Sequence, residues 1–147
     1  MLSTIEKVIY LKSADIFAQI PDRMLSKIAT LLDTVDYLPG QVIFAKGEPG
    51  DAMYVIVAGS VQITDDGLAL EQLGAGGVFG ELALLDDEPR SASVTATEDT
   101  LLLRLPQAEF HELLNDYGEI ARGIIYVLSQ RLRARTHDLH ARHISSQ

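Results

Sequence analysis

The sequence predicts an α+β fold: an antiparallel β-sandwich, or jelly roll, flanked by N-terminal helices and by C-terminal helices. Apolar residues recur at three- and four-residue spacing near both ends, and short alternating runs punctuated by Gly and Pro lie between them. The 147 residues, 47% of them hydrophobic, suffice for one domain with its own core. We divide the chain into a helical segment 1–34, a sandwich 35–105, and C-terminal helices with a tail 106–147.

The chain begins with a pattern typical of two amphipathic helices. Apolar positions from Leu2 to Ile9 have helical spacing and predict a helix over residues 2–12. Asp15 suggests a cap and a new start. Pro21 then occupies a first-turn position, and the apolar spacing that follows predicts a second helix over residues 22–33.

The middle of the chain changes to a two-residue period. Pro-Gly, Gly-Ser and Asp-Asp-Gly turn signals separate its runs, as in an antiparallel sandwich. The predicted strands cover residues 35–38, 41–46, 52–57, 61–64, 68–73, 91–97 and 101–105.

Pro106 ends the predicted strands, and helical spacing returns over residues 107–115. Gly118 interrupts it, and a longer helix follows that runs past Arg135 and frays before residues 145–147. Several arginines gather on this helix, Arg131 among them. We interpret it as a solvated or lid helix rather than a nucleic-acid-binding arm.

Composition narrows the function classes. The formal net charge of −9 argues against non-specific binding to nucleic acid or to an anionic membrane. The chain has no cysteine, which removes disulfides, thiol catalysis and zinc-thiolate sites. No run approaches the roughly 20 apolar residues of a membrane span, and no signal-peptide pattern opens the sequence. We therefore expect a cytoplasmic protein without direct membrane insertion, or the soluble part of a larger or membrane-attached one.

Residues 79–94 combine groups that few cores place together. Gly80 allows close approach to the backbone, and the short helical turn after it offers free N–H groups to an anion. Arg90 adds a planar, permanently charged fork suited to a phosphate, and Ser91 adds a hydroxyl. Glu81 has the wrong charge for a phosphate, so its use would be to accept a hydrogen bond, and a ribose hydroxyl is a natural donor. The stretch predicts a site for a compact ligand with an anion on one side and a hydroxyl on the other.

This stretch resembles the phosphate-binding cassette of the cyclic nucleotide-binding domain family, found in bacterial catabolite activators and protein kinase A regulatory subunits. The resemblance covers about residues 14–135 and implies a double-stranded β-helix with a C-terminal lid helix. The residues that match the family pattern are Phe79, Gly80, Glu81, Leu82, Ala83, Leu84, Pro89, Arg90, Ser91, Ala92, Ser93 and Val94.

The resemblance implies a role for individual residues. Arg90 is expected to pair with the exocyclic oxygens of a cyclic phosphate, and Glu81 to accept from the ribose 2′-hydroxyl. Ser91 is expected to touch the phosphate. The cradle is completed by the backbone N–H groups of Gly80, Leu82, Ala83 and Ala92. The lid region over the base is expected around Leu128, Arg131, Leu132 and Arg135.

We therefore predict a regulatory sensor domain that binds cyclic AMP, with cyclic GMP as the second choice, and signals through its flanking helices. A homodimer or an upstream effector domain is the expected partner. Two alternatives stay open: a module that has lost its ligand and serves interaction or dimerisation, and a truncated transcription regulator. The chain ends too soon after the long helix for a helix-turn-helix domain, which favours the sensor.

Catalysis and metal binding have little support in the sequence. The histidines, His111, His137, His140 and His143, fall in the predicted C-terminal helices at spacings that match no compact metal pair, so we expect surface or tail positions. No nucleophile elbow is visible, and we predict no enzyme. The acidic run at residues 86–88 is read as a solvated loop rather than a metal site.

Overall fold

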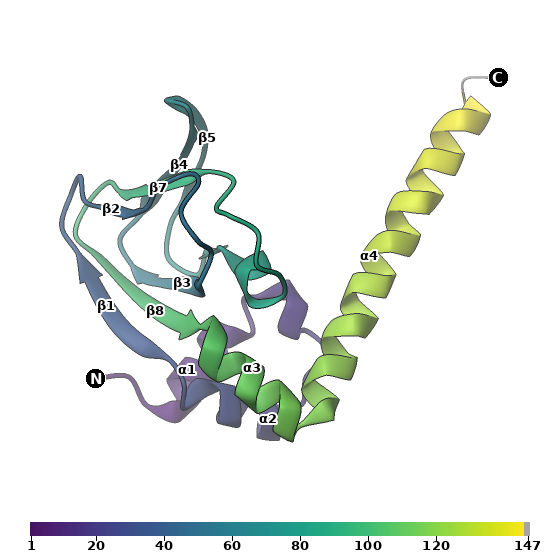
Figure 1. Ribbon diagram of the computed structural model, residues 1–147, viewed down its shortest axis with the longest axis horizontal. Coiled ribbons are helices and arrows are strands. Elements are labelled where there is room, and N and C mark those ends of the chain that lie inside the picture. Colours follow the sequence, from purple (N-terminus) through teal and green to yellow (C-terminus); the bar gives the residue numbers. More distant parts are fainter. Residues whose placement is uncertain (146–147) are drawn as a thin grey trace.

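The computed structural model describes residues 1–145, and the side chains of residues 1–140. The expected tail at residues 146–147 and the side chain of His143 lie outside this range. Helices occupy both ends of the described chain and strands its middle, as predicted (Figure 1). The α-helices are α1 (Thr4–Leu11), α2 (Asp22–Ala29), α3 (Gln107–Asp116) and α4 (Gly118–Ser145), and the 3₁₀ helices are η1 (Asp15–Phe17) and η2 (Glu81–Leu84).

The described strands form two antiparallel four-stranded sheets, with strand orders β1-β8-β3-β6 and β2-β7-β4-β5. This confirms the predicted antiparallel sandwich. The strands are β1 (Asp33–Tyr37), β2 (Val42–Phe44), β3 (Ala52–Ala58), β4 (Val61–Asp65), β5 (Leu68–Leu73), β6 (Val78–Phe79), β7 (Ser93–Ala96) and β8 (Thr100–Pro106).

Two local predictions were wrong. Helix α2 ends at Ala29 instead of residue 33, because Asp33 already pairs with Arg104 in the first rung of the β1–β8 ladder. Strand β6 was missed because it has only two residues, Val78 and Phe79, which pair with Val55 and Tyr54 of β3. A strand this short after a glycine-rich run carries no alternation to detect.

The buried apolar residues form two clusters that share β3. Met53 and Val55 face a cluster built mainly by the helices, which includes Phe17 and Phe110. Ala52, Tyr54 and Ile56 face a second cluster inside the sandwich. Alternate side chains of a strand point to opposite faces, so β3 is buried on both of its faces and separates the two clusters.

Helix α4 is anchored near its start and extends away from the sandwich along the rest of its length (Figure 1). Ile120 and Ile124 are buried in the helical cluster. A Cβ added at Gly123 would lie 3.1 Å from Cγ1 of Ile20, so the helix packs closely against the segment after η1. From Arg131 to His140 every side chain is exposed. None of the helices described here has the length and apolar character needed to cross a membrane.

Candidate functional site

The turn that opens the cassette requires a glycine. Gly80 precedes η2 with a φ of +72°, in the left-handed region that favours glycine. A Cβ at this position would lie 2.7 Å from Nη1 of Arg90 and 3.1 Å from the carbonyl oxygen of Ala52. Both the backbone angle and the close approach of Arg90 therefore disfavour a larger residue. The N–H of Ala83, expected in the cradle, donates to the Gly80 carbonyl at 3.2 Å.

Arg90 is buried beneath this turn, with only 7% of the residue exposed. Its Nη2 donates to the carbonyl of Ala52 at 2.9 Å and lies 3.6 Å from Oδ1 of Asp51. Its Cζ lies 3.9 Å from the ring centroid of Phe44. Removal from water lowers the pKa of Arg90, an effect that nearby groups such as Tyr54 and Asp51 oppose.

One buried nitrogen of Arg90 is left without a hydrogen bond. Nε is buried and has no hydrogen-bond partner among the described residues. A buried donor without a partner costs about 1–3 kcal/mol. An anion bound beside the guanidinium would remove that cost, so the geometry fits a phosphate next to Arg90.

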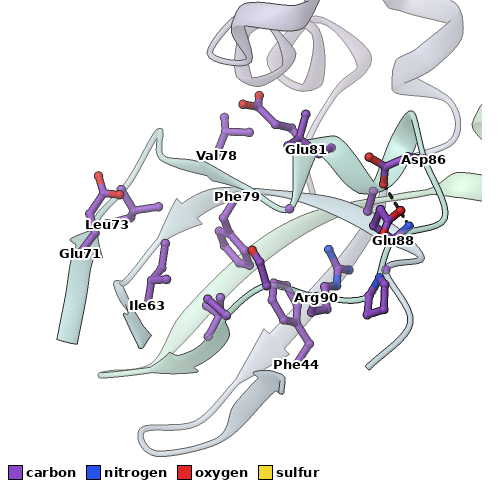
Figure 2. Close-up of a pocket in the computed structure, with 18 residues that line it drawn as sticks. Phe44, Ile63, Glu71, Leu73, Val78, Phe79, Glu81, Asp86, Glu88 and Arg90 are labelled. Carbon is purple, nitrogen blue, oxygen red and sulfur yellow. Dashed lines mark hydrogen bonds between the residues drawn. The ribbon is translucent and has the colours of Figure 1, made fainter. Parts of the chain in front are cut away.

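A pocket of about 520 Å³ opens beside Arg90, within the size range of small-molecule sites (Figure 2). Phe44 and Phe79, whose ring centroids are 5.9 Å apart, lie near its middle. Every cassette residue named from the sequence as ligand-binding lines this pocket. These residues are Phe79, Gly80, Glu81, Leu82, Ala83, Arg90, Ser91 and Ala92.

Glu81 lies across the pocket from Arg90 and is half-buried (Figure 2). Burial raises the pKa of this carboxyl, Arg131 acts in the opposite direction, and Asp15 raises the pKa further. A partly desolvated carboxylate is a strong acceptor for a hydroxyl donor. Glu81 therefore has the position and the chemistry of a hydroxyl-binding group separate from the anion site.

The end of the pocket away from Arg90 was not identified from the sequence. It is formed by Ile63 of β4, Leu73 of β5 and Val78 of β6, with the carboxylate of Glu71 beside Leu73 (Figure 2). Apart from Glu71 these residues are apolar, and an apolar wall suits the flat face of a base. Alternation along β4 and β5 could have indicated which residues face inward, but not that they reach the cassette.

The acidic loop is exposed, as expected of a solvated loop, yet Asp86 and Glu88 also line the pocket. The N–H of Glu88 donates to Oδ1 of Asp86 at 3.2 Å, which holds the loop in a tight turn. Among the described residues no group of carboxylates and histidines is arranged to hold a metal ion. The loop therefore borders the ligand space with negative charge.

Arg131 lies outside the pocket. Its Nη2 is 3.8 Å from Oδ2 of Asp15, and both residues border a second hollow of about 370 Å³ between η1 and α4. Its positive charge acts to lower the pKa of Glu81, against the larger effect of burial. The expected contact between Arg131 and a ligand would need α4 to move, and it stays a prediction.

Helix α3 holds the far end of the cassette turn. Nε2 of Gln107 donates to the carbonyls of Ala83 at 2.7 Å and Asp86 at 2.9 Å. Nε2 of His111 lies 2.7 Å from the carbonyl of Leu84. His111 was expected at the surface, but it is half-buried and bonded to the cassette. Sequence reasoning missed both contacts because they join residues more than 20 positions apart.

Known proteins resemble this chain over most of its length. The chain is 34% identical over 119 residues to a "cAMP-dependent protein kinase regulatory subunit" of Aspergillus niger, an alignment covering 80% of this chain and 29% of the relative. It is 31% identical over 134 residues to a "CRP-like cAMP-activated global transcriptional regulator" of Mycobacterium tuberculosis, covering 88% and 60%. The chain thus spans less than two thirds of either curated relative.

A solved structure shows the same fold. The N-terminal domain of a transcriptional regulator from Streptomyces coelicolor superposes with a TM-score of 0.80 at 30% identity, covering 88% of this chain and 95% of that one. The sequence profile of the "Cyclic nucleotide-binding domain" family matches residues 34–117, from the first strand to the end of α3. The chain therefore belongs to the cyclic nucleotide-binding domain family.

Proposed function

We propose that this chain is a sensor domain that binds cyclic AMP in the pocket between the cassette and the sandwich. The observation that carries the proposal is the buried, unpartnered Nε of Arg90 at a pocket wall. An arginine kept only for structure would be expected to satisfy its buried donors within the protein. The names of two relatives, a kinase regulatory subunit and a transcriptional regulator, both refer to cAMP.

Three parts of the pocket would contact the phosphate, the ribose and the base of the ligand. Arg90 and the hydroxyl of Ser91 would bind the cyclic phosphate, helped by the N–H groups of Gly80, Leu82 and Ala92. Glu81 would accept from the ribose 2′-hydroxyl. The base would lie toward the apolar end, beyond Phe79. The side chains of Leu82 and Ala83 would close the cassette side, and Leu82 is free to do so because it is exposed.

Calorimetric titration of the purified chain with cyclic AMP and cyclic GMP tests the proposal. We expect saturable binding of cyclic AMP, and 2′-deoxy cyclic AMP should bind more weakly to the wild type. In Glu81→Gln the difference in affinity between cyclic AMP and its 2′-deoxy form should shrink, because the amide is a weaker acceptor for the 2′-hydroxyl than the carboxylate. Failure of the wild-type chain to bind either nucleotide, after removal of any co-purified ligand, would favour the ligand-free alternative.

We further propose that ligand binding moves α4 toward the pocket. The helix extends away from the sandwich (Figure 1), and the expected lid residues around Leu132 are exposed. The ion pair between Arg131 and Asp15, at 3.8 Å and largely exposed, is a weak restraint on such a movement. A ligand shifts this equilibrium only by its differential affinity for the closed state.

The absence of cysteine from the sequence makes this movement measurable. Cysteines introduced at Gly67, in the β4–β5 turn, and at Arg135, on α4, can carry a pair of spin labels. We expect saturating cyclic AMP to shorten the distance between the labels. An unchanged distance in a chain that demonstrably binds the nucleotide would refute the lid.

A homodimer through α4 is a second proposal, supported by three exposed apolar residues. Ile125, Leu132 and Leu139 are 64%, 66% and 59% exposed and follow one another at seven-residue intervals. Seven residues is the heptad length of a coiled coil, and these three residues would occupy one of the two apolar positions in each heptad. Sedimentation of the wild type and of Leu132→Asp tests it, with a dimer expected only for the wild type. A monomeric wild type at high micromolar concentration would exclude this mode of pairing.

A further inference from the structure

Strand β5 places one carboxylate on the wall that would receive the base. In the β4–β5 ladder, Val61 pairs with Leu73 and Ile63 pairs with Glu71. Val61 is fully buried in the sandwich cluster, and Leu73 and Ile63 pack against the same cluster. Paired residues of an antiparallel ladder share a face, so Glu71 also belongs to the inner face of β5.

The carboxylate of Glu71 has no hydrogen bond or ion pair with any residue whose side chain the structure describes. Its neighbours on the same hairpin behave differently: Asp65 and Asp66 lie 2.6 and 3.0 Å from Nζ of Lys46. Glu71 therefore ends an otherwise apolar part of the pocket as an unused acceptor. Figure 2 shows it at the opposite end of the pocket from Arg90.

The two charged ends define a ligand with complementary ends. Arg90 requires an anion, and Glu71, which only accepts hydrogen bonds, requires a donor. Adenine carries an amino group at its 6-position, whereas guanine carries a carbonyl oxygen there, which a carboxylate would repel. The hydroxyl of Ser91, in the cassette, both donates and accepts hydrogen bonds, so it does not decide between the two bases.

We infer that Glu71 is a specificity-determining residue that accepts a hydrogen bond from the 6-amino group of adenine and disfavours guanine. The inference rests on the proposed nucleotide function and assigns the choice of base to β5. The Glu71 side chain is exposed, so binding the amino group requires little movement of buried structure. Its effect should therefore fall on the ratio of affinities between nucleotides rather than on stability.

Affinities of cyclic AMP, cyclic GMP and cyclic IMP for the wild type and for Glu71→Gln test the inference. Cyclic IMP has the 6-carbonyl of guanine but lacks its 2-amino group. We expect the wild type to prefer cyclic AMP over both others by roughly 10- to 150-fold, the range of one charge-assisted hydrogen bond. In Glu71→Gln this preference should largely disappear, because an amide can donate to the 6-carbonyl.

Gln72→Ala is the matched control, since Gln72 neighbours Glu71 on β5, is exposed and is not among the residues lining the pocket. It should leave all three affinities unchanged. Equal preference for cyclic AMP in Glu71→Gln and the wild type would overturn the inference while leaving nucleotide binding intact. A specific loss of cyclic GMP affinity in Glu71→Gln would overturn it too, because Glu71 would then read the guanine amino edge. Binding of none of the nucleotides by the wild type would overturn the proposed function as well.

Discussion

Replacing Arg90 by methionine should separate ligand binding from folding. Only 7% of the Arg90 residue is exposed, and its Nε has no partner among the described residues, so the protein without ligand bears the cost of a buried charge. Methionine removes that cost along with the bond to the Ala52 carbonyl, and its flexible thioether suits the site beside Phe44. We expect the free energy of unfolding without ligand to change by less than about 1 kcal/mol.

In Arg90→Met the stabilisation by cyclic AMP should nearly vanish. Loss of a charge-assisted contact of about 1.5–3 kcal/mol weakens affinity by roughly 10- to 150-fold. At cyclic AMP concentrations about 100 times the wild-type Kd, the wild type gains about 2.7 kcal/mol, and a variant weakened about 100-fold gains about 0.4 kcal/mol. For a domain of this size, the rise in melting temperature should drop from about 5–11 °C to about 1–2 °C.

Thermal unfolding by calorimetry, with and without cyclic AMP, measures both quantities in one series. Arg104→Met is the control, because Arg104 also lies 3.6 Å from a carboxylate oxygen of Asp51 but does not line the pocket. It should retain the full ligand-dependent shift. An undiminished shift in Arg90→Met would show that the phosphate site lies elsewhere. A loss of more than about 3 kcal/mol without ligand would show that Arg90 serves the fold.

Three further predictions concern the surroundings of Arg90. Burial raises the pKa of Glu81, so the folded chain holds the carboxyl proton more tightly than the unfolded chain does. The free energy of unfolding, measured by urea titration, should therefore fall as pH rises from the ordinary glutamate range through the raised pKa. Glu81→Gln should remove that fall. Gly80→Ala should lower cyclic AMP affinity as well as stability, whereas Gly40→Ala, at a φ of +86° with no atom within 4 Å of the added Cβ, should cost only about 1–2 kcal/mol of stability in the same unfolding and titration series. Arg131→Ala should weaken the affinity for cyclic AMP if α4 brings the arginine to the ligand. Asp15→Ala should strengthen that affinity, because it releases Arg131 from its ion pair. Equal weakening of the affinity in both variants, measured by titration, would contradict a role for Arg131 at the ligand.

The sequence predicted the sandwich well because its signals are local. Alternation and turn residues mark β3, β4 and β5 within a residue or two of their observed ends. The end of α2 was misplaced because Leu31 and Leu32 continue the helical period while pairing with β8 claims the chain from Asp33. The local helical spacing competes there with strand pairing to residues about 70 positions away, which a local sequence pattern cannot reveal.

The candidate site divides in the same way. Its cassette side could be predicted because Gly80, Glu81 and Arg90 fall within one short motif. Its other side could not, because Ile63, Glu71 and Leu73 reach the pocket only through sheet pairing. Arg131 was assigned to the lid from the resemblance, and its contact with a ligand stays a prediction; in the structure its Nη2 lies 3.8 Å from Asp15.

A single strand, β3, lies between the sandwich interior, where a nucleotide would bind, and the apolar cluster that anchors the helices. Tyr54 stacks on Phe79 at 5.1 Å between ring centroids on one side, while Met53 and Val55 press against the helical cluster on the other. Close-packed interiors transmit displacement rather than absorbing it. A ligand that shifts Phe79 would therefore push on the helix anchors through β3, which gives the domain a mechanical route from pocket to helices that does not depend on any charged residue.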